Sequence, residues 1–439
     1  MSVVEKTSSK LFSLDSLSPV DPAQSKIHVP WSYRSYKPKS TEQLQNLYPK
    51  IRFQESSFAN GMWLLLAGEA PNVVMPWIMN GDNLADAMLD MFLAHAFTQD
   101  RGEFGPNVQN LSVLSVFGDW RQDLPSKKDL PPGMRSEVGA EQEDVEEVAM
   151  AMAQSSWSLA VASLMKHTAG VKNLVTVDSH SFPASQQFES LGIDTVNITT
   201  AKLMIESLRN NGYLKDNMPT MIVGVDFSNL ALAKKLHDEE GFELGVIRKH
   251  RIPALDGRPS KTEHELVYGD VRGRRVILMD DMIGSGGTIL KTVELLLIDG
   301  AEEVIICASH AVFAGREYYE QLQDVLRNDK VKIVMLSDTL PLERPTRGGD
   351  KDLPYVLVAD GARSYERREV AMLEVDDFIA YITGVMLLSS SAEEIANRMG
   401  EHVLPQVDPY DLYYQVTGKK VPRPTVVASY KEGGQFKRL

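Results

Sequence analysis

Two adjacent carboxylates stand at the end of one predicted strand. In RRVILMDDMIGSGGTILKTVELLLIDGA (274–301), the apolar run 276–279 leads directly into Asp280 and Asp281. Such a run, bounded by turn residues, predicts a buried strand. In an open parallel sheet, ligands bind at the carboxyl ends of the strands. Two carboxylates do not hold a phosphate directly, but they can bind the hydroxyl groups of a sugar and the hydration shell of a magnesium ion.

A glycine-rich turn follows the two aspartates and leads into a predicted helix. Glycine permits a tight turn and a close backbone approach, so several amides can point at one anion. The N-terminus of the helix adds its dipole and its N–H groups, which favour a phosphate. A polar strand end with a helix cap would explain the shorter strings DD or GGT, but the whole strand–turn–helix context favours a ligand site. The predicted phosphate-binding residues are Ser285, Gly286, Gly287 and Thr288.

The composition is that of an ordinary globular protein without disulfides. At 439 residues the chain is long enough for two domains. Its net charge of −14 argues against a general nucleic-acid binder. The single cysteine, Cys307, excludes an intrachain disulfide and suits a reducing compartment. The N-terminus lacks the pattern of a signal peptide and no apolar run reaches a membrane span, so we expect a cytoplasmic protein with no membrane partner.

Strand-like runs alternate with helix-like segments from about residue 51 onward. This alternation predicts an α/β fold of two domains, each a mostly parallel sheet flanked by helices. We expect an N-terminal extension (1–50), two domains (51–205 and 206–390) and a C-terminal extension (391–439), the last with one helix and an irregular tail. The polar segment 123–147 predicts a long loop that runs into a helix.

The string VILMDDMIGSGGT resembles the phosphoribosyl-binding loop of the type I phosphoribosyltransferase (PRTase) fold. That fold serves phosphoribosyltransferases and also the ribose-phosphate pyrophosphokinases, or PRPP synthetases. Two further segments resemble the pyrophosphokinases, whereas phosphoribosyltransferases generally lack both. NLVTVDSHS, with His180, is similar to their Asp-x-His element, and LGVIRKHRI, with Lys249 and Arg251, to their catalytic Lys-x-Arg. The segment after Arg251 is rich in glycine and proline, as a closing flap would be.

The resemblance implies a role for each matching residue. Lys249 and Arg251 would stabilise the charge that develops on the transferred diphosphate. Asp226 would bind ribose, and together with His180 it would hold Mg²⁺. Asp280 and Asp281 would bind the ribose diol. The residues expected to bind ATP are His180, Arg121 and Gln122 of VFGDWRQDL, and Phe58 and Asn60 of SFANGM, a loop that a neighbouring subunit contributes in this family.

The sequence departs from the family pattern at several positions. Met62 replaces a glutamate, Ser228 and Asn229 replace a glycine pair, and Gly284 stands where an aspartate is frequent. Loss of an acid and of side-chain bulk at the phosphate loop is compatible with a substrate whose 5-phosphate carries a further group. ADP-ribose is such a substrate, since its phosphate is a less charged diester that needs an exit path.

The resemblance therefore predicts a Mg²⁺-dependent pyrophosphokinase. It would transfer the β,γ-diphosphate of ATP to the anomeric hydroxyl of ribose 5-phosphate. Three alternatives stay open: the same chemistry with ADP-ribose in NAD salvage, an inactive regulatory subunit, and a phosphoribosyltransferase. The retained Lys249, Arg251 and His180 argue against the inactive subunit. We also expect a homo-oligomer built from dimers, with the hexamers of the family as one form.

Overall fold

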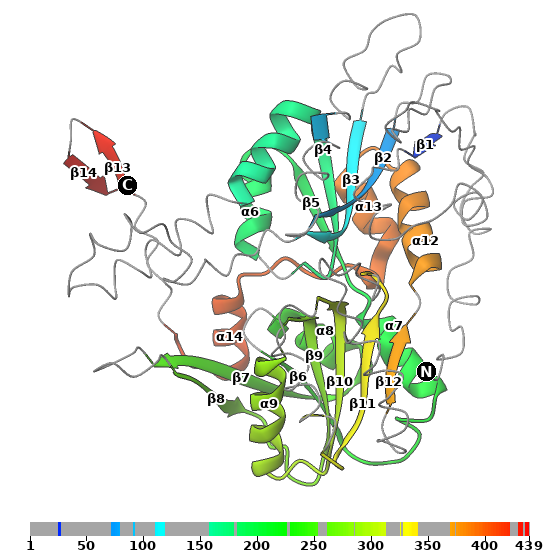
Figure 1. The fold of residues 1–439 in the computed structure, drawn as a ribbon, viewed down its shortest axis with the longest axis vertical. Helices are drawn as coiled ribbons and strands as arrows, with labels where there is room; N and C mark the ends of the chain where they lie inside the picture. Colours follow the sequence, from blue (N-terminus) through cyan, green and yellow to red (C-terminus); the bar gives the residue numbers. More distant parts are fainter. Residues whose placement is uncertain are drawn as a thin grey trace, which may run out of the picture.

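The computed structural model contains two large β-sheets, one above the other in Figure 1. The structure describes residues 25–27, 72–79, 91–92, 110–118, 158–179, 182–225, 229–252, 261–284, 286–312, 325, 328–340, 369–373, 375–421, 429–432 and 435–438. Both sheets are mostly parallel and carry helices, which confirms the predicted α/β fold class.

The first sheet has five strands in the order β1-β2-β3-β4-β5, and every neighbouring pair is parallel. Parallel neighbours need crossover connections, so the intervening segments must pass over the faces of the sheet. The strands are β1 (Ser25–Ile27), β2 (Asn72–Met79), β3 (Asn110–Gly118), β4 (Val171–Val177) and β5 (Asp194–Ile198).

The second sheet has seven strands in the order β12-β11-β10-β9-β6-β7-β8, and only β8 is antiparallel to its neighbour. The order reverses between β6 and β9, which is where open α/β sheets bind ligands. The strands are β6 (Thr220–Gly224), β7 (Glu243–Ile252), β8 (Lys261–Tyr268), β9 (Arg275–Ile283), β10 (Glu303–Ala311), β11 (Val331–Ser337) and β12 (Glu369–Leu373).

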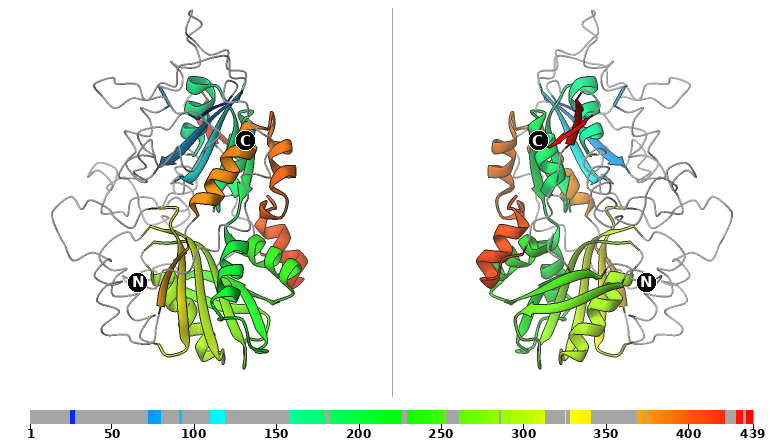
Figure 2. Two further views of the ribbon diagram at one scale, coloured as in Figure 1. Left: turned by 90° about the vertical axis from the view of Figure 1, so that its right-hand side faces the viewer. Right: turned by 90° about the vertical axis from the view of Figure 1, so that its left-hand side faces the viewer.

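Helices lie on both faces of the sheets, as Figure 2 shows from two further sides. They are the π-helix η2 (Leu164–Ala169), α6 (Phe182–Ser190), α7 (Ala201–Asn210), α8 (Leu230–Glu240), α9 (Gly287–Ile298), α12 (Asp376–Leu387), α13 (Ala392–Met399), the 3-10 helix η4 (Gly400–His402) and α14 (Pro409–Thr417). A separate antiparallel pair, β13 (Ser429–Glu432) and β14 (Gln435–Arg438), follows near the end of the chain.

Each central strand is apolar on both sides because it is covered on both faces. In β3, Val113 packs with η2 and α6, whereas the next residue, Leu114, packs with α12. In β9, Leu278 faces α9 and Met279 faces α8. Successive side chains of a strand point to opposite faces, so these continuous apolar runs are the expected signature of buried parallel strands.

One hydrophobic core runs through both sheets. The same cluster contains Val175 of the first sheet, Ile305 of the second sheet, Leu203 of α7 and Phe378 of α12. After β12 the chain leaves the second sheet, because α12 packs on β2 and β3 and α13 packs on β4 and β5. The two sheets are therefore tied together by shared packing and by a chain segment that returns to the first sheet.

Several elements differ from the sequence-based expectation. The short strand β5 (DTVNI) and the charged strand β8 (KTEHELVY) have too few apolar residues for their pattern to stand out. The region after residue 391 holds α13, η4, α14 and a hairpin, which is more than the one helix and irregular tail that we expected. Most of the predicted N-terminal extension and the whole 123–147 loop lie outside the described residues.

Within the described part of the chain, no helix is long and apolar enough to span a membrane. Cys307 is fully buried in β10, and burial raises the pKa of its thiol to about 12. The thiol is therefore neutral at physiological pH and acts as a small apolar core residue.

Candidate functional site

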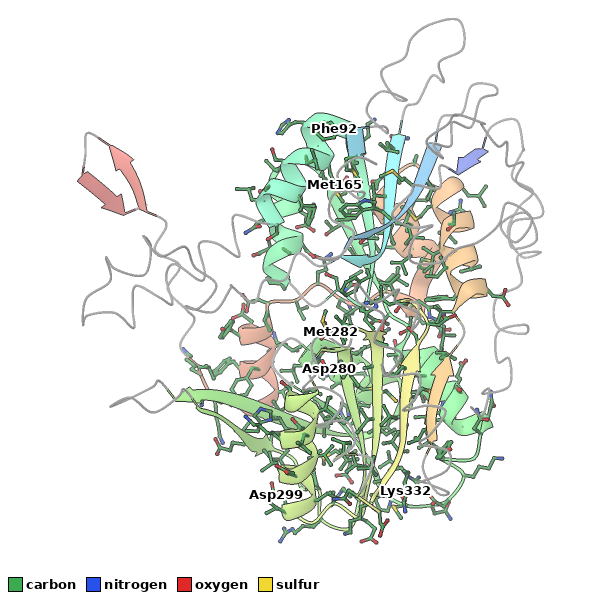
Figure 3. The ribbon with its side chains drawn as sticks, in the orientation of Figure 1. Phe92, Met165, Asp280, Met282, Asp299 and Lys332 are labelled. Atoms are coloured by element: carbon green, nitrogen blue, oxygen red, sulfur yellow. The ribbon has the colours of Figure 1, made fainter. Side chains whose placement is uncertain are left out.

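The two adjacent aspartates lie at the carboxyl end of β9, between β6 and β10. Asp280 and Asp281 are 7% and 3% exposed, and Ala308 of β10 is the register partner of Asp280. Figure 3 shows Asp280 at the end of the second sheet that faces the first sheet, with Asp299 and Lys332 at the opposite end. The structure thus places both carboxylates at the expected ligand-binding edge.

Asn229, the residue before α8, contacts both aspartates. Its Nδ2 donates a hydrogen bond of 2.8 Å to Oδ1 of Asp280 and a longer one of 3.5 Å to Oδ1 of Asp281. The backbone N–H of Asp281 also donates to Oδ1 of Asp280, at 3.0 Å. The orientation of the Asp280 carboxylate is therefore fixed by two donors on one oxygen. Sequence analysis noted Asn229 only as a departure from the family pattern and assigned it no role.

The glycine turn after β9 has two kinds of position. Gly286 has φ +80°, is buried and directly precedes α9, whose first backbone bond runs from Leu290 N–H to the Gly286 carbonyl at 2.9 Å. Only glycine adopts this left-handed backbone readily. Gly284 differs, because a Cβ built there meets no heavy atom of the described residues within 4 Å. Gly287 and Thr288 form the first turn of α9, as predicted for a phosphate-binding N-terminus.

The predicted catalytic pair lies on a hairpin arm that continues from the second sheet. β7 runs parallel to β6 up to Val246 and then pairs with the antiparallel β8. In this arm Lys249 is the register partner of His264, and Arg251 of Thr262. Because β6, β7 and β9 are parallel, Lys249 and Arg251 belong to the same edge of the sheet as Asp280.

His264 connects the hairpin arm to the helix that follows the glycine turn. Its Nδ1 lies 2.8 Å from Oγ1 of Thr292 in α9. The arm and the predicted phosphate site are therefore joined by a side-chain contact as well as by the sheet. The other predicted site residues lie outside the described residues: Phe58, Asn60, Arg121, Gln122, His180, Asp226 and Ser285.

A buried polar cluster joins the two sheets beside this edge, and no sequence pattern predicted it. Asp178, 3% exposed, follows β4 with φ +45°. Its Oδ2 accepts from the Thr200 N–H at 2.9 Å, from the Thr200 hydroxyl at 2.7 Å and from the Ser309 hydroxyl at 2.6 Å. Asp178 belongs to the first sheet and Ser309 to β10 of the second, so this carboxylate bridges the two.

His310 extends the cluster. Its Nε2 lies 3.0 Å from the Val177 carbonyl of β4, and its Nδ1 lies 2.8 Å from Oγ1 of Thr339. The ring also packs edge-on against Phe117 of β3, with centroids 5.0 Å apart. Ser309 and His310, which are adjacent in β10, thus form the joint between the sheets.

The predicted magnesium site is described only in part, because His180 and Asp226 lie outside the described residues. Among the residues that the structure does describe, no three His, Cys, Asp or Glu side chains form a cluster of metal ligands. Oδ1 of Asp178, two residues before His180, is buried and accepts no hydrogen bond from the described residues. Carboxylate oxygens are the ligands that Mg²⁺ prefers, alongside water and substrate phosphates, so the residues present fit this ion.

Comparison with known proteins identifies the class of this fold. Residues 195–338 match the phosphoribosyl transferase domain, a stretch that contains β9, the glycine turn and α9. The crystal structure of phosphoribosylpyrophosphate synthetase from Mycobacterium smegmatis superposes with a TM-score of 0.51 at 20% identity, covering 84% of this chain and 100% of that chain. The fold is therefore similar to that of this synthetase, and residues 195–338 match the phosphoribosyl transferase domain.

Curated relatives are similar to somewhat less than half of this chain. Ribose-phosphate pyrophosphokinase from Mycobacterium tuberculosis is 33% identical over 202 residues, which are 45% of this chain and 55% of the relative. The enzyme of the same name from Aquifex aeolicus is 30% identical over 182 residues, which are 42% of this chain and 53% of the relative. The chain spans about half the length of the curated relatives it matches. These relatives carry the name of the family that the motifs of this chain resemble.

Proposed function

We propose that the protein transfers the β,γ-diphosphate of ATP to the anomeric hydroxyl of a ribose 5-phosphate unit. The supporting observation is the junction of β9 and α9, where two buried carboxylates precede a glycine-capped helix N-terminus at the switch point of the sheet. The carboxylates suit a sugar diol and the helix N-terminus suits a phosphate. This junction lies within the matched phosphoribosyl transferase domain.

In this reaction the anomeric oxygen forms a bond to the β-phosphorus of ATP, and the bond from that phosphorus to the α-phosphate oxygen breaks. The sugar leaves as a 1-diphosphate, AMP is released, and the anomeric hydroxyl gives up its proton. No covalent intermediate on the protein is needed, so the protein acts by positioning and by electrostatic stabilisation.

Each site residue has one task in this scheme. Asp280 and Asp281 hold the ribose diol, and Ser285 with Gly286, Gly287 and Thr288 holds the 5-phosphate. Lys249 and Arg251, on the arm of β7 at the same sheet edge, stabilise the charge on the moving diphosphate. His180, Arg121, Gln122, Phe58 and Asn60 hold ATP.

Magnesium would be held by His180 and Asp226 and would neutralise phosphate charge in the transition state. The residues of the chain orient the two substrates around it.

The test is AMP release from ATP and Mg²⁺ with ribose 5-phosphate, with the mass of the product confirmed. Lys249→Ala should abolish most of this turnover, since a cation near a transferring phosphoryl group supplies several kcal/mol. Lys332→Ala is the matched control, because Lys332 lies at the opposite end of the sheet (Figure 3). Equal turnover in both variants would remove Lys249 from the proposed catalytic role.

A second candidate acceptor is ADP-ribose, and the open space at Gly284 favours it. Since a Cβ meets nothing within 4 Å there, packing does not require glycine at this position. A glycine that packing does not need leaves room beside the phosphate for a further group. The same assay with ADP-ribose decides between the acceptors. AMP from neither acceptor would favour an inactive regulatory subunit.

The oligomer is part of the proposal, because the family places the 57–62 loop in the site of a neighbouring subunit. Light scattering during gel filtration should therefore give a mass of at least two chains. A strictly monomeric yet active protein would show that the ATP site is complete within one chain.

A further inference from the structure

The side chain of Asn229 contacts both members of the aspartate pair. It is 3% exposed and stands at the first residue before α8. Asparagine at this position normally accepts a hydrogen bond from the N–H groups of its own helix. Here α8 receives no side-chain cap from Asn229. The amide instead donates to Asp280, 51 residues further along the chain.

Backbone packing fixes the position of Asn229 relative to Asp280. A Cβ at Gly224, the last residue of β6, would lie 2.8 Å from the Asn229 carbonyl oxygen, so the chain passes this close only because residue 224 is glycine. Gly224 is also the register partner of Met279 in β9, and the Val225 N–H donates to the Met279 carbonyl at 3.1 Å. The start of α8 is therefore fixed against the residue that precedes Asp280.

The chemistry of the amide suits a carboxylate pair that must bind a ligand. Nδ2 of Asn229 donates to both carboxylates, at 2.8 Å and 3.5 Å, without bringing a charge of its own. A lysine or arginine here would compensate the negative charge and compete with the ligand. An aspartate would add a third carboxylate and its repulsion. The amide orients Asp280 and leaves its negative charge in place.

We infer that Asn229 is a positioning residue of the sugar site: it holds the Asp280 carboxylate in the orientation that accepts hydrogen bonds from the hydroxyls of the sugar. This inference rests on the proposed function, whose acceptor it concerns. It makes the sugar site depend on residues from two strand ends, Asn229 after β6 and Asp280 at the end of β9.

The inference predicts a specific kinetic pattern. Asp280 would bind the sugar hydroxyls in the ground state and in the transition state alike, so its misorientation raises KM for the acceptor and changes kcat little. Asn229→Gly removes the donor, and KM for ribose 5-phosphate should rise about tenfold, as expected when a hydrogen bond to a charged group is lost. KM for ATP should stay within about twofold, because no ATP contact is assigned to this pair.

Two further variants separate positioning from a merely structural role. Asn229→Asp keeps the shape but replaces the donor with an acceptor next to Asp280, so KM for the acceptor should rise more than in Asn229→Gly. In an Asp280→Asn background, Asn229→Gly should have little further effect, because the group that it positions is already altered. Asn211→Gly, the same substitution at the end of α7, should leave both KM values unchanged.

The outcomes distinguish this inference from the proposed function. AMP formation by the unchanged protein tests the function, and calorimetric binding of ribose 5-phosphate gives a second readout if turnover is absent. The inference fails if Asn229→Gly keeps the acceptor KM and binding constant of the unchanged protein. It also fails if KM for ATP and for the acceptor rise together while the melting temperature falls, since that pattern marks a structural role. A protein that neither turns over nor binds the sugar phosphate contradicts both.

Discussion

Asp178 and Asp280 are both buried carboxylates at the carboxyl end of an inner strand, and the structure surrounds them differently. Asp178 receives hydrogen bonds from Thr200 and Ser309, and through Ser309 it ties the first sheet to the second. Asp280 receives hydrogen bonds from Asn229 and from the backbone N–H of Asp281, both at one edge of the second sheet. The carboxylate of Asp178 thus joins the two sheets. The carboxylate of Asp280, at an equivalent place, is held beside a glycine turn.

The difference teaches that sequence context alone does not separate a structural carboxylate from one that we propose to bind a ligand. Both aspartates follow an apolar strand and precede a helix. The distinguishing feature is the origin of one donor: Ser309, which donates to Asp178, comes from the other sheet, whereas Asn229, which donates to Asp280, comes from the neighbouring strand end of the same sheet. Five experiments break or sharpen this comparison.

The largest loss of activity is expected when the proposed ligand-binding pair, Asp280 and Asp281, is changed. Asp281→Ala should lower kcat/KM for the sugar acceptor at least about 100-fold, since hydrogen bonds to a charged group contribute about 1.5–3 kcal/mol each. The measurement is steady-state turnover at varied acceptor concentration. Asp299→Ala, at the far end of α9, is the control and should change little. If Asp281→Ala lowered the stability of the fold and left kcat/KM unchanged, Asp281 would have a structural role like that of Asp178.

At the joint between the two sheets, substitution of Asp178 should lower the stability of the protein. Asp178→Ala leaves the donors of Thr200 and Ser309 buried without their acceptor, which should lower the free energy of unfolding by about 3 kcal/mol. Chemical denaturation measures this change. Asp194→Ala removes an exposed aspartate at the start of β5 and should stay within about 0.5 kcal/mol. Equal stability of the two variants would show that the joint does not depend on this carboxylate.

The glycine turn offers a matched pair of substitutions. Gly286→Ala forces an alanine to φ +80° and should lower stability by about 1–2 kcal/mol, and it should also weaken phosphate binding by displacing the start of α9. Gly284→Ala should be nearly neutral, because the added Cβ meets nothing within 4 Å. Thermal unfolding and binding of ribose 5-phosphate measure both effects. If Gly284→Ala were the more damaging of the two, the assignment of the left-handed position would be wrong.

Gly284→Asp additionally tests the acceptor. The added acid should reduce use of ADP-ribose by filling the open space, with a smaller effect on ribose 5-phosphate. Relative turnover with the two acceptors gives the answer.

The smallest expected effect is the pH dependence of the free energy of unfolding. The joint continues through Thr199, whose N–H donates to the His402 carbonyl at 2.8 Å. The pKa of the His402 side chain is lowered to about 4, mainly by burial; Glu401 opposes this shift, and Lys202 and Lys235 add to it. The unfolded chain therefore binds a proton near pH 6.5 that the folded chain binds only near pH 4. Stability from this group is complete above about pH 6.5 and is lost as the pH falls toward 4.

We expect the free energy of unfolding to fall by about 1–2 kcal/mol between pH 7.5 and 5. His402→Gln should remove that part of the slope, as measured by denaturation at several pH values. An identical slope in the variant would assign the pH dependence to other groups.

The sequence predicted the fold class and the second sheet well, because the inner strands are long apolar runs such as VILM before Asp280. The Asp280–Thr288 junction was predicted for the same reason, since strand, turn and helix are all local patterns. The roles of Asn229 and Ser309 were not predicted. Both depend on contacts between residues far apart in the chain, 51 and 131 positions respectively, which no local pattern encodes. One feature of the sequence did point to Asn229: it is a residue typical of helix starts, and the family pattern has glycine at this position.

The return of α12 and α13 to the first sheet has a consequence for synthesis on the ribosome. One face of that sheet is covered by residues 376–399, which are translated after every strand of both large sheets. Domains usually fold in order as they emerge from the ribosome. Here the earlier sheet would keep an apolar face exposed until nearly the whole chain has been made. The nascent protein would thus complete its second sheet before its first, and truncation before residue 376 should leave the N-terminal part dependent on chaperones.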